Sequence, residues 1–413
     1  MEHEMHILWF TNAPLEPLKK EIGMPAGGSG YWMTAMLEQF QAQKKFKISV
    51  ATLAPYAAVH KRIGGIEYYL IPQKQHRFFP PSDSHYLQKC MALIQQIKPD
   101  IIHVHGTEKF FGLLKEFFPG IPFLISFQGL IGPTSEWSAY YGGINLKMVL
   151  MMETLRSFLN GSSPLRGYFQ LKRQVRPEQK TLKLNSYFEG RTDWDRAYLE
   201  THNPKAVYYS IPNILRDSFF NCRWDPGRIE RHRIFVSNCR TARSGADLML
   251  KAFKTIKGLY PGSTLYIAGT NPKLKRGYQK YLSDLAGPFG GDCFFTGYLS
   301  ADELAEQLCK AHVFVHPTYI DNSPNSLAEA LVVGTPCVAS CVGGKMSMIR
   351  HNHTGLLFPN HDKYLLAERI RQIFDSDELA GALSQNGCEE TRKKHNRHSI
   401  FDQYKTMYEK LGQ

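Results

Sequence analysis

Short apolar segments alternate with longer amphipathic segments along most of this 413-residue chain. The first such pair is residues 6–10, which have the pattern of a strand, and residues 31–43, which have the pattern of a helix. A second series of the same kind begins at residues 234–237 and reaches its last strand at residues 355–358. Strands separated by helices are typical of βαβ units in a parallel sheet. The alternation therefore predicts an α/β protein built from doubly wound, Rossmann-like parallel sheets.

The chain is too long for one hydrophobic core, so we expect more than one domain. The irregular, charged segment that starts at residue 213 has the composition of a linker. We therefore predict an N-terminal domain of residues 1–212 and a C-terminal domain of residues 213–395. Doubly wound domains bind ligands beyond the carboxyl ends of their strands, so two of them facing each other form a cleft. Residues 396–413 contain a last helix, which we expect to pack back toward the N-terminal domain.

The charge balance narrows the classes of partner. The chain carries 50 Lys and Arg against 37 Asp and Glu, a formal net charge of +13. Such a surface suits nucleic acid, an anionic membrane or phosphorylated ligands. The sequence holds no basic helical repeat and no aromatic-studded RNA-binding strand. We therefore expect phosphates and a membrane surface as partners, and no nucleic acid.

The N-terminus and the cysteines indicate the compartment. The first ten residues, MEHEMHILWF, are acidic and lack a signal-peptide pattern. No apolar run approaches the roughly 20 residues that a membrane-spanning helix needs. The eight cysteines show neither a paired framework nor the spacing of zinc ligands. We expect a cytoplasmic protein, with a peripheral position on the inner face of the membrane as a further hypothesis.

Residues 139–184 break the alternation and have the pattern of one or two helices. Basic residues there outnumber the two acids, Glu153 and Glu178. The basic residues are Lys147, Arg156, Arg166, Lys172, Arg173, Arg176, Lys180 and Lys183. One interpretation is a solvated helical surface that packs on its own domain. The other is docking of residues 147–183 on an anionic membrane.

The stretch 316–344 places a polar loop, a short helix and a Gly-Thr-Pro stop between two strands. Ser323 and Pro324 have the chemistry of a helix start, with Ser323 as the N-cap and Pro324 at the first helical position. The N-terminus of such a helix favours an anion, because its first amides have no partner within the helix. Those amides belong to Asn325, Ser326 and Leu327.

Two acids, Asp321 and Glu329, lie eight positions apart in the same stretch. Glu329 stands among Leu, Ala and Val, where an ionised carboxylate is strongly unfavourable unless a specific group pairs with it. An anion-binding helix end beside two acids indicates a nucleotide-sugar pocket.

Through these residues the chain resembles the retaining GT-B glycosyltransferases of family 4, also called glycosyltransferase group 1. The resemblance covers nearly the whole chain and is strongest over residues 294–344, with Asp321 and Glu329 in the places of the family's Glu-x7-Glu pair. It implies a GT-B fold, two Rossmann-like domains facing across a cleft. It also implies that Asp321 approaches the hydroxyls of the donor sugar and Glu329 those of the ribose. The amides of residues 325–327 would take the diphosphate.

Two further segments match the family. The glycine loop ending the first βα connection would let the backbone approach the donor phosphate, although a turn without a ligand stays an alternative. Its residues are Gly28, Ser29 and Gly30. Gly297 and Tyr298 match the loop near which the base of the nucleotide lies.

The chain departs from the family where an Arg and a Lys usually neutralise the leaving diphosphate. Ser244 falls where that lysine is expected, and Asn238 or Cys239 falls near the arginine. We predict that Arg240 and Arg243 take over, because a guanidinium binds phosphate with two parallel hydrogen bonds.

Three residues of the N-terminal half complete the predicted site. Gln128 stands where the family often has a histidine, and it can hydrogen-bond but not titrate. His105 is predicted to line the acceptor side of the cleft, with plain packing as the alternative. Arg191, at the start of a helix over residues 192–201, is predicted to face the cleft.

The sequence Asp193-Trp-Asp195 resembles the metal-binding motif of the other large glycosyltransferase fold. Because Thr192 is a good N-cap, we interpret both acids as first-turn helix residues that complement the helix dipole. We predict no metal and no cofactor, with a UDP- or GDP-sugar as co-substrate.

The resemblance implies a retaining, metal-independent hexosyltransferase that uses a glycan, glycolipid or lipid-linked acceptor, in bacterial surface polysaccharide synthesis. A nucleotide-sugar 2-epimerase of the same fold is one alternative. A non-catalytic nucleotide-sugar-binding partner subunit is another, because the usual Lys and His are absent at Ser244 and Gln128.

Overall fold

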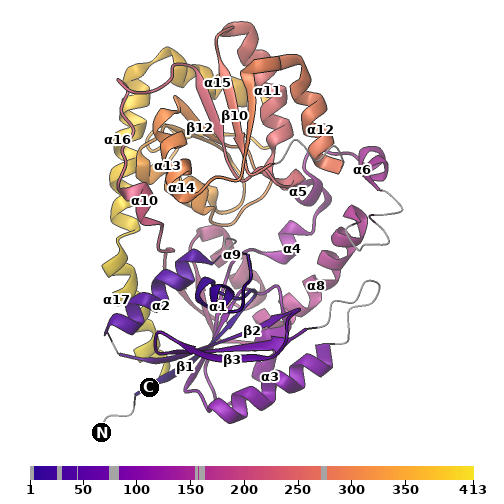
Figure 1. Ribbon diagram of the computed structural model, residues 1–413, viewed down its shortest axis with the longest axis vertical. Coiled ribbons are helices and arrows are strands. Elements are labelled where there is room, and N and C mark those ends of the chain that lie inside the picture. The colour runs from indigo at the N-terminus through magenta and orange to yellow at the C-terminus, as the bar shows by residue number, and fades with distance from the viewer. Residues whose placement is uncertain are drawn as a thin grey trace.

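The fold has two β-sheets of mainly parallel strands, each flanked by helices. The two sheets lie one above the other along the long axis of the molecule (Figure 1). The computed structural model describes residues 4–25, 30–43, 45–73, 83–153, 157, 163–270 and 277–413. The predicted architecture of two doubly wound α/β domains is confirmed.

The N-terminal sheet has the strand order β3-β4-β2-β1-β5-β6-β7-β8 in the described part of the chain. Every neighbouring pair is parallel except β3 with β4, which is antiparallel. The strands are β1 (His6–Thr11), β2 (Lys47–Ala54), β3 (Val59–Ile63), β4 (Ile66–Pro72), β5 (Ile101–His105), β6 (Phe123–Ser126), β7 (Tyr187–Gly190) and β8 (Val207–Ser210). Its carboxyl ends point toward the other sheet (Figure 1).

Helices cover both faces of this sheet. One face packs against α2 (Tyr31–Gln43) and the last helix, α17 (Arg397–Leu411). The other face packs against α3 (Asp83–Ile97), α8 (Pro164–Leu184) and α9 (Asp193–His202). The short 3-10 helix η1 (Phe110–Glu116) also lies on this second face. A short helix, α1 (Glu16–Glu21), has no counterpart among the predicted elements.

The C-terminal sheet is wholly parallel in its described strands, with the order β11-β10-β9-β12-β13-β14. The strands are β9 (Arg233–Val236), β10 (Thr264–Ala268), β11 (Cys293–Gly297), β12 (Val313–His316), β13 (Cys337–Ser340) and β14 (Leu356–Phe358). The helices around it are α11 (Ala246–Leu259), α12 (Gly277–Ala286), α13 (Ala301–Lys310), α14 (Asn325–Val333), α15 (Lys363–Asp375) and α16 (Asp377–Lys394). Helix α16 was not among the predicted elements.

The chain crosses between the sheets twice. The first crossing follows β8 and leads into the short helix α10 (Asp217–Phe220), inside the segment expected to be irregular. The second lies between α16 and α17, which run along one side of the molecule (yellow in Figure 1). Helix α17 is fastened to the N-terminal sheet, where the Trp9 ring nitrogen donates to the Tyr408 hydroxyl at 3.1 Å.

The basic segment of residues 139–184 contains α5 (Trp137–Tyr141), α6 (Leu146–Met152) and α8. A small hydrophobic cluster around Tyr141, Ile144 and Val149 also takes in Ala242 and Tyr278 of the C-terminal half. This segment therefore packs against both domains and not only its own.

Candidate functional site

Helix α14 begins at the carboxyl end of β12, after a loop of eight residues. Pro324 is the N-cap, with φ −66° and ψ 115°, so the predicted positions of Ser323 and Pro324 are each wrong by one residue. The Leu327 amide donates to the Pro324 carbonyl at 3.1 Å, and Leu327 is fully buried. In the described chain the amides of Asn325 and Ser326 have no acceptor. The helix end therefore offers two free amides to an anion, and the third predicted amide, that of Leu327, is already used.

The Glu329 carboxylate lies one turn into α14 and is 5% exposed. Both of its oxygens accept hydrogen bonds from Arg216, from Nε to Oε1 at 2.8 Å and from Nη2 to Oε2 at 2.8 Å. Burial raises the pKa of Glu329, and the hydrogen bonds and charge of Arg216 act against that rise. The specific partner that the buried position of Glu329 demands is thus Arg216, which lies 113 residues earlier in the chain.

Asp321 lies in the loop before α14, with Oδ2 4.0 Å from Nε2 of His316. Burial raises the pKa of Asp321, while the positive charges of Lys345 and Arg243 act against the rise. The structure therefore gathers two cations around this acid. Arg243 was predicted to be a site residue, whereas Lys345 was not.

Lys345 is fully buried in the 3-10 helix η4 (Gly343–Ser347). Its ammonium donates to the Thr318 hydroxyl at 2.8 Å, to the Thr318 carbonyl at 3.1 Å and to the Ser340 hydroxyl. Burial lowers the pKa of Lys345 to about 7, and the charge of Asp321 acts in the opposite direction. The sequence does mark this position. Lys345 follows two glycines shortly after a buried strand, where a charged side chain needs specific partners.

The two predicted phosphate-binding arginines take different places. Arg243 lies in the 3-10 helix η2 (Ala242–Ser244), its guanidinium carbon 5.7 Å from the centre of the Tyr140 ring. Arg240 is exposed, and its guanidinium carbon lies 5.9 Å from the centre of the Tyr298 ring. The structure brings Arg243 to Asp321, and it brings Arg240 to Tyr298 in the loop predicted to lie near the base. Ser244 is buried, and its hydroxyl donates to the Thr241 carbonyl at 2.6 Å, so it caps a turn.

The remaining predicted donor residues lie at chain turns. Asn238 is exposed with φ +60°, directly after β9. Gly297 has φ +74°, and its carbonyl accepts from the Gly269 amide at 2.7 Å. Tyr298, which follows it, is 72% exposed. Gly30 has φ +113°, and its carbonyl accepts the amides at the start of α2. The predicted residues Gly28 and Ser29 lie outside the described residues.

His105 is 1% exposed at the end of β5. Its ring lies 4.4 Å from that of Trp9 and 5.4 Å from that of Trp32, measured between ring centres. In the described chain neither ring nitrogen has a hydrogen-bond partner, and burial holds the pKa of His105 well below its usual value. His105 therefore packs inside the N-terminal domain beneath α2.

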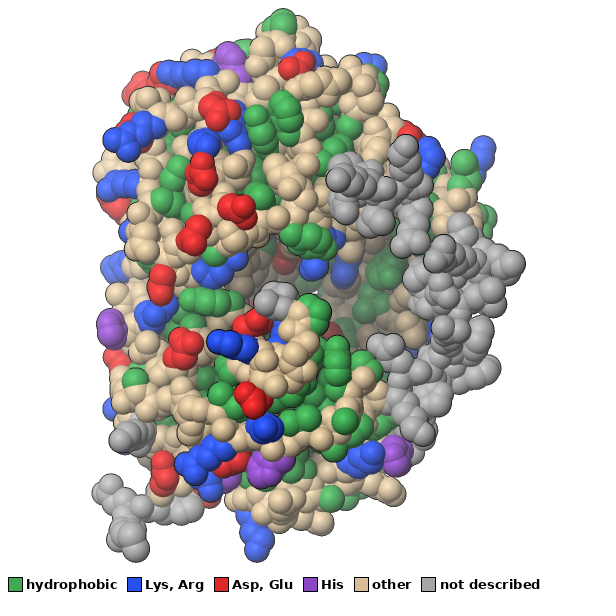
Figure 2. Space-filling view, viewed as in Figure 1, with side chains coloured by type: hydrophobic (Ala, Val, Ile, Leu, Met, Phe, Trp, Pro, Cys, Tyr) green, Lys and Arg blue, Asp and Glu red, His purple; other side chains and the backbone are tan. Residues whose placement is uncertain are grey.

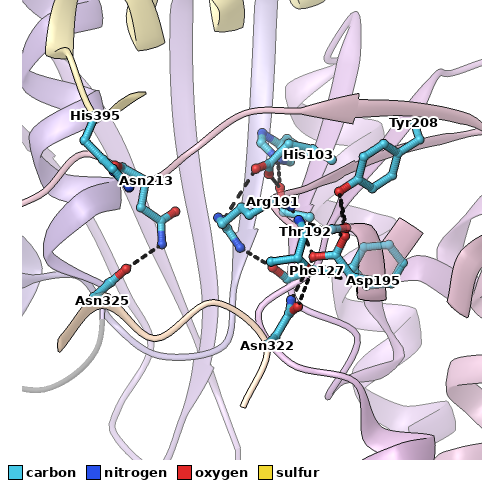
Figure 3. Close-up of polar contacts among 12 residues, drawn as sticks. His103, Phe127, Arg191, Thr192, Asp195, Tyr208, Asn213, Asn322, Asn325 and His395 are labelled. Atoms are coloured by element: carbon cyan, nitrogen blue, oxygen red, sulfur yellow. Dashed lines mark hydrogen bonds and ion pairs between the residues drawn. The ribbon is translucent and has the colours of Figure 1, made fainter. Parts of the chain in front are cut away.

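Arg191 is also buried, at 5% exposure. Its guanidinium lies 3.5 Å from the Glu189 carboxylate and donates to the Phe127 carbonyl (Figure 3). Arg191 therefore lies across the carboxyl ends of β6 and β7. It contacts Phe127, the residue that precedes Gln128 in the chain. The Gln128 side-chain nitrogen is buried and has no hydrogen-bond partner in the described chain. Arg191 is therefore not open to solvent as a cleft-facing role predicts, whereas Gln128 is half-buried.

The N-terminus of α9 joins the two domains (Figure 3). The Thr192 hydroxyl donates to Asn322 Oδ1 at 2.9 Å, and Asn322 Nδ2 donates to Asp195 Oδ2 at 3.0 Å. Thr192 and Asp195 form a capping box, which confirms the prediction that Asp193 and Asp195 are first-turn helix residues. The loop that carries Asp321 is thereby fixed against the N-terminal domain.

The surface of the molecule is hollowed between the two domains (Figure 2). The carboxyl ends of both sheets and the N-terminus of α14 meet at this level of the fold (Figure 1). Across the described ranges no group of three or more His, Cys, Asp or Glu side chains is arranged to hold a metal ion.

Residues 223–390 match the sequence family described as "Glycosyl transferases group 1". The protein YtcC of Bacillus subtilis (strain 168), a glycosyltransferase by its name, is 22% identical over 308 residues, which cover 73% of this chain and 70% of YtcC. These matches confirm the predicted resemblance to group 1.

Solved structures show the same fold. Sucrose-phosphate synthase of Thermosynechococcus elongatus superposes with a TM-score of 0.73 at 16% identity, covering 99% of both chains. HepE of Anabaena, solved in complex with UDP-glucose, gives a TM-score of 0.67 at 12% identity, covering 98% of this chain and 100% of HepE. The predicted GT-B fold is confirmed.

Proposed function

The chain carries a glycosyl transferases group 1 domain over residues 223–390, and we propose that it is a retaining hexosyltransferase of family 4. The donor is a UDP- or GDP-sugar, and the acceptor is a glycan, glycolipid or lipid-linked sugar. One observation carries the proposal: the free amides at the start of α14 lie between two acids, Asp321 and Glu329, each balanced by cations. Such a site suits a ligand with both phosphates and hydroxyls.

In the proposed complex the diphosphate lies at the amides of Asn325 and Ser326. Glu329 accepts hydrogen bonds from the ribose hydroxyls, and Asp321 from the hydroxyls of the donor sugar. As the bond to the sugar breaks, negative charge grows on the diphosphate. Arg243 and the helix amides stabilise that charge, because fixed positive groups aimed at a developing anion lower the barrier.

We propose retention of configuration through a same-face displacement, in which the departing phosphate helps to deprotonate the acceptor. Arginines and amides carry the charge that a metal ion carries in other transferases. Movement of the two domains toward each other would exclude water and favour transfer over hydrolysis.

A lipid-linked acceptor agrees with the surface around α6 and α8. Met151 is 75% exposed and Phe169 is 58% exposed, beside the exposed cations Lys172, Arg173 and Arg176 of α8. Apolar side chains next to cations are typical of helices that lie in an anionic membrane surface. No helix in the described part of the chain is long and apolar enough to cross a membrane. We therefore propose peripheral binding to the cytoplasmic face of the membrane and a role in bacterial surface polysaccharide synthesis.

The proposal is tested by measuring release of UDP or GDP from a panel of nucleotide-sugars, with and without acceptors and with and without a chelator. Glu329→Ala is expected to abolish release, and the chelator is expected to leave it unchanged. Undiminished release from Glu329→Ala would remove Glu329 from the donor site, and loss with chelator would exclude the metal-free mechanism.

Two alternative functions make different predictions in the same assay. A nucleotide-sugar 2-epimerase turns over its donor without any acceptor, and the product sugar is a 2-epimer. A non-catalytic partner subunit binds the donor in a calorimetric titration but does not turn it over, whichever acceptor is present. The capping role of Ser244, in the place of the usual lysine, is the observation that favours this second alternative.

A further inference from the structure

Arg216 stands at the end of the first crossing between the domains, directly before α10. Its two hydrogen bonds to Glu329 are both 2.8 Å long and leave from two different nitrogens of the guanidinium. A pair of this kind fixes the orientation of the carboxylate as well as its charge. The Arg216 guanidinium carbon lies 4.8 Å from the centre of the buried Phe219 ring, which supports the arginine in turn.

The same crossing is attached to α14 at a second point, one turn nearer the N-terminus of the helix. Asn213 Nδ2 donates to Asn325 Oδ1 at 3.0 Å (Figure 3). The Asn213 carbonyl accepts from Nδ1 of His395 at 2.8 Å, at the second crossing. The position of the crossing is thus tied both to the helix that starts at the free amides and to the carboxylate of that helix.

While it is paired with Arg216, Glu329 can still accept hydrogen bonds from further donors. An ionised carboxylate has about four lone-pair sites, and the two bonds from Arg216 use one on each oxygen. Two hydroxyl groups on neighbouring carbons have the spacing and the donors to use the remaining sites. Arg216 therefore orients the carboxylate for a diol and does not block it.

We propose that Arg216 is a positioning residue for donor recognition, which holds Glu329 ionised and aimed at the two ribose hydroxyls of the nucleotide. The inference rests on the proposed donor site and adds a residue to it. Arg216 is the charged group that acts on Glu329 in the described part of the chain, and burial of the carboxyl acts in the opposite direction. Without Arg216 the carboxyl takes up a proton at higher pH, and a protonated carboxyl has fewer sites for a diol.

A purely structural ion pair makes a different prediction. Removing one partner of a buried pair destabilises the fold whatever ligand is present. Nucleotides with and without ribose hydroxyls would then lose affinity equally. Comparing nucleotides with and without ribose hydroxyls therefore distinguishes a positioning role of Arg216 from a purely structural one.

The experiment is calorimetric titration of UDP and GDP, and of their 2′,3′-dideoxy forms, into the 413-residue protein at several pH values from mildly acidic to mildly alkaline, because burial raises the pKa of Glu329. The proteins are wild type, Arg216→Met, Arg216→Lys, Glu329→Ala and Arg228→Met. Arg228 is a matched control, because it lies nearby in the chain with its side chain 86% exposed and pairs with Asp225 at 3.5 Å. Thermal unfolding of each variant establishes that it is folded.

We expect Arg216→Met to bind the ribonucleotide roughly tenfold more weakly than wild type, in line with the loss of hydrogen bonds to a charged group. As the pH is lowered, the affinity of Arg216→Met should fall further. This fall should begin at a higher pH than the corresponding fall for wild type. The dideoxynucleotide should bind equally to both proteins. Arg216→Lys keeps the charge without the paired geometry, so its affinity for the ribonucleotide should lie between those of wild type and Arg216→Met. Arg228→Met should match wild type.

Equal affinity of wild type and Arg216→Met for the ribonucleotide would overturn the inference, and so would equal losses for the ribo- and dideoxy forms. If Glu329→Ala binds the ribonucleotide as well as wild type does, the proposed donor site itself is wrong. If wild type binds neither UDP nor GDP, the proposed function and this inference fall together.

Discussion

Asn322 Nδ2 donates to Asp195 Oδ2 at 3.0 Å, and this bond joins the C-terminal and N-terminal domains directly beside Asp321. Asn322 Oδ1 also accepts from the Thr192 hydroxyl, so both ends of one amide are used across the boundary. The loop that carries the predicted sugar-binding acid is therefore held by the opposite domain. The Asn322 side chain therefore couples the position of the domains to the loop that carries Asp321.

Replacing Asn322 by Ala is expected to lower the free energy of unfolding by about 1–3 kcal/mol, because Asp195 and Thr192 lose buried partners. The catalytic rate should fall as well, since the loop with Asp321 loses its support. Urea unfolding and nucleotide release measure the two effects. The control is Asn386→Ala, a half-buried asparagine that donates to the His353 carbonyl at 3.2 Å away from the domain boundary, and an Asn322→Ala variant with wild-type stability and rate would contradict the coupling.

Arg243 and Arg240 are expected to differ in their contribution to catalysis. Arg243 acts electrostatically on Asp321, whereas Arg240 lies beside the exposed ring of Tyr298. Arg243→Met should lower kcat by about 100-fold, the usual loss when one group that stabilises a developing anion is removed. Arg240→Met should act mainly on the KM for the donor. Steady-state rates of nucleotide release decide this, and equal losses in kcat for the two variants would contradict the assignment.

Local sequence chemistry predicted helix α14 to within one residue at its start. A Pro near the helix start, an apolar surround for Glu329 and a Gly stop are all readable over the eleven residues 324–334. The same logic states that Glu329 needs a partner but cannot name it, because Arg216 is distant in sequence and reaches α14 only through the crossing between domains. The placement of Leu327 was missed for a finer reason. With Pro324 as the N-cap, Leu327 is the third helical residue, whose amide an α-helix leaves free, but here that amide closes a 3-10-type bond to the Pro324 carbonyl.

Burial of the N-terminal residues was harder to predict. His105 alternates with His103 on a strand, a pattern equally consistent with a cleft wall and with a core position. Trp9, Trp32 and the last helix decide between them by covering that face of the sheet. The sequence predicts a last helix that packs back toward the N-terminal domain, but no local pattern places that helix over the face of the sheet that carries His105.

Lys345 is expected to make the stability of the protein depend on pH. Burial lowers its pKa from 10.5 to about 7, and Asp321, His316 and Cys341 are the titratable groups that interact with it in the described chain. Between these two values the unfolded chain binds more protons than the folded one, so the free energy of unfolding rises with pH. Lys345→Met removes this rise.

Urea unfolding at pH 7 and pH 9, within the window that linkage defines, compares wild type with Lys345→Met. The gain in stability from the lower to the higher pH should be larger for wild type. The exposed Lys89→Met controls for the loss of one lysine and should keep the wild-type slope. Equal slopes for wild type and Lys345→Met would show that Lys345 is not the source of the rise.

Changing Lys172, Arg173 and Arg176 together to Glu is expected to reduce binding to anionic vesicles at least tenfold, since each cation near such a surface contributes about 1 kcal/mol. Vesicle sedimentation at low and high salt measures the effect, which should shrink as salt screens the charges. The charge-matched control changes Arg228, Lys280 and Lys310, three cations of the C-terminal domain, to Glu. Equal loss in both triple variants would indicate a response to net charge and not a docking surface on α8.

Tyr408 is expected to hold the last helix in place. Its hydroxyl lies 2.6 Å from Nδ1 of His103 and accepts the Trp9 ring N–H at 3.1 Å, and all three side chains are fully buried. Tyr408→Phe keeps the ring and removes both bonds, which should lower the free energy of unfolding by about 1–3 kcal/mol, because the Trp9 ring N–H loses its buried acceptor. Tyr364→Phe, at a 68% exposed position, is the control for loss of a hydroxyl. Hydrogen exchange adds a local measure: amides of α17 should exchange faster in Tyr408→Phe, while those of α11 should not. Unchanged exchange in α17 would mean that its apolar contacts hold the helix without the hydroxyl.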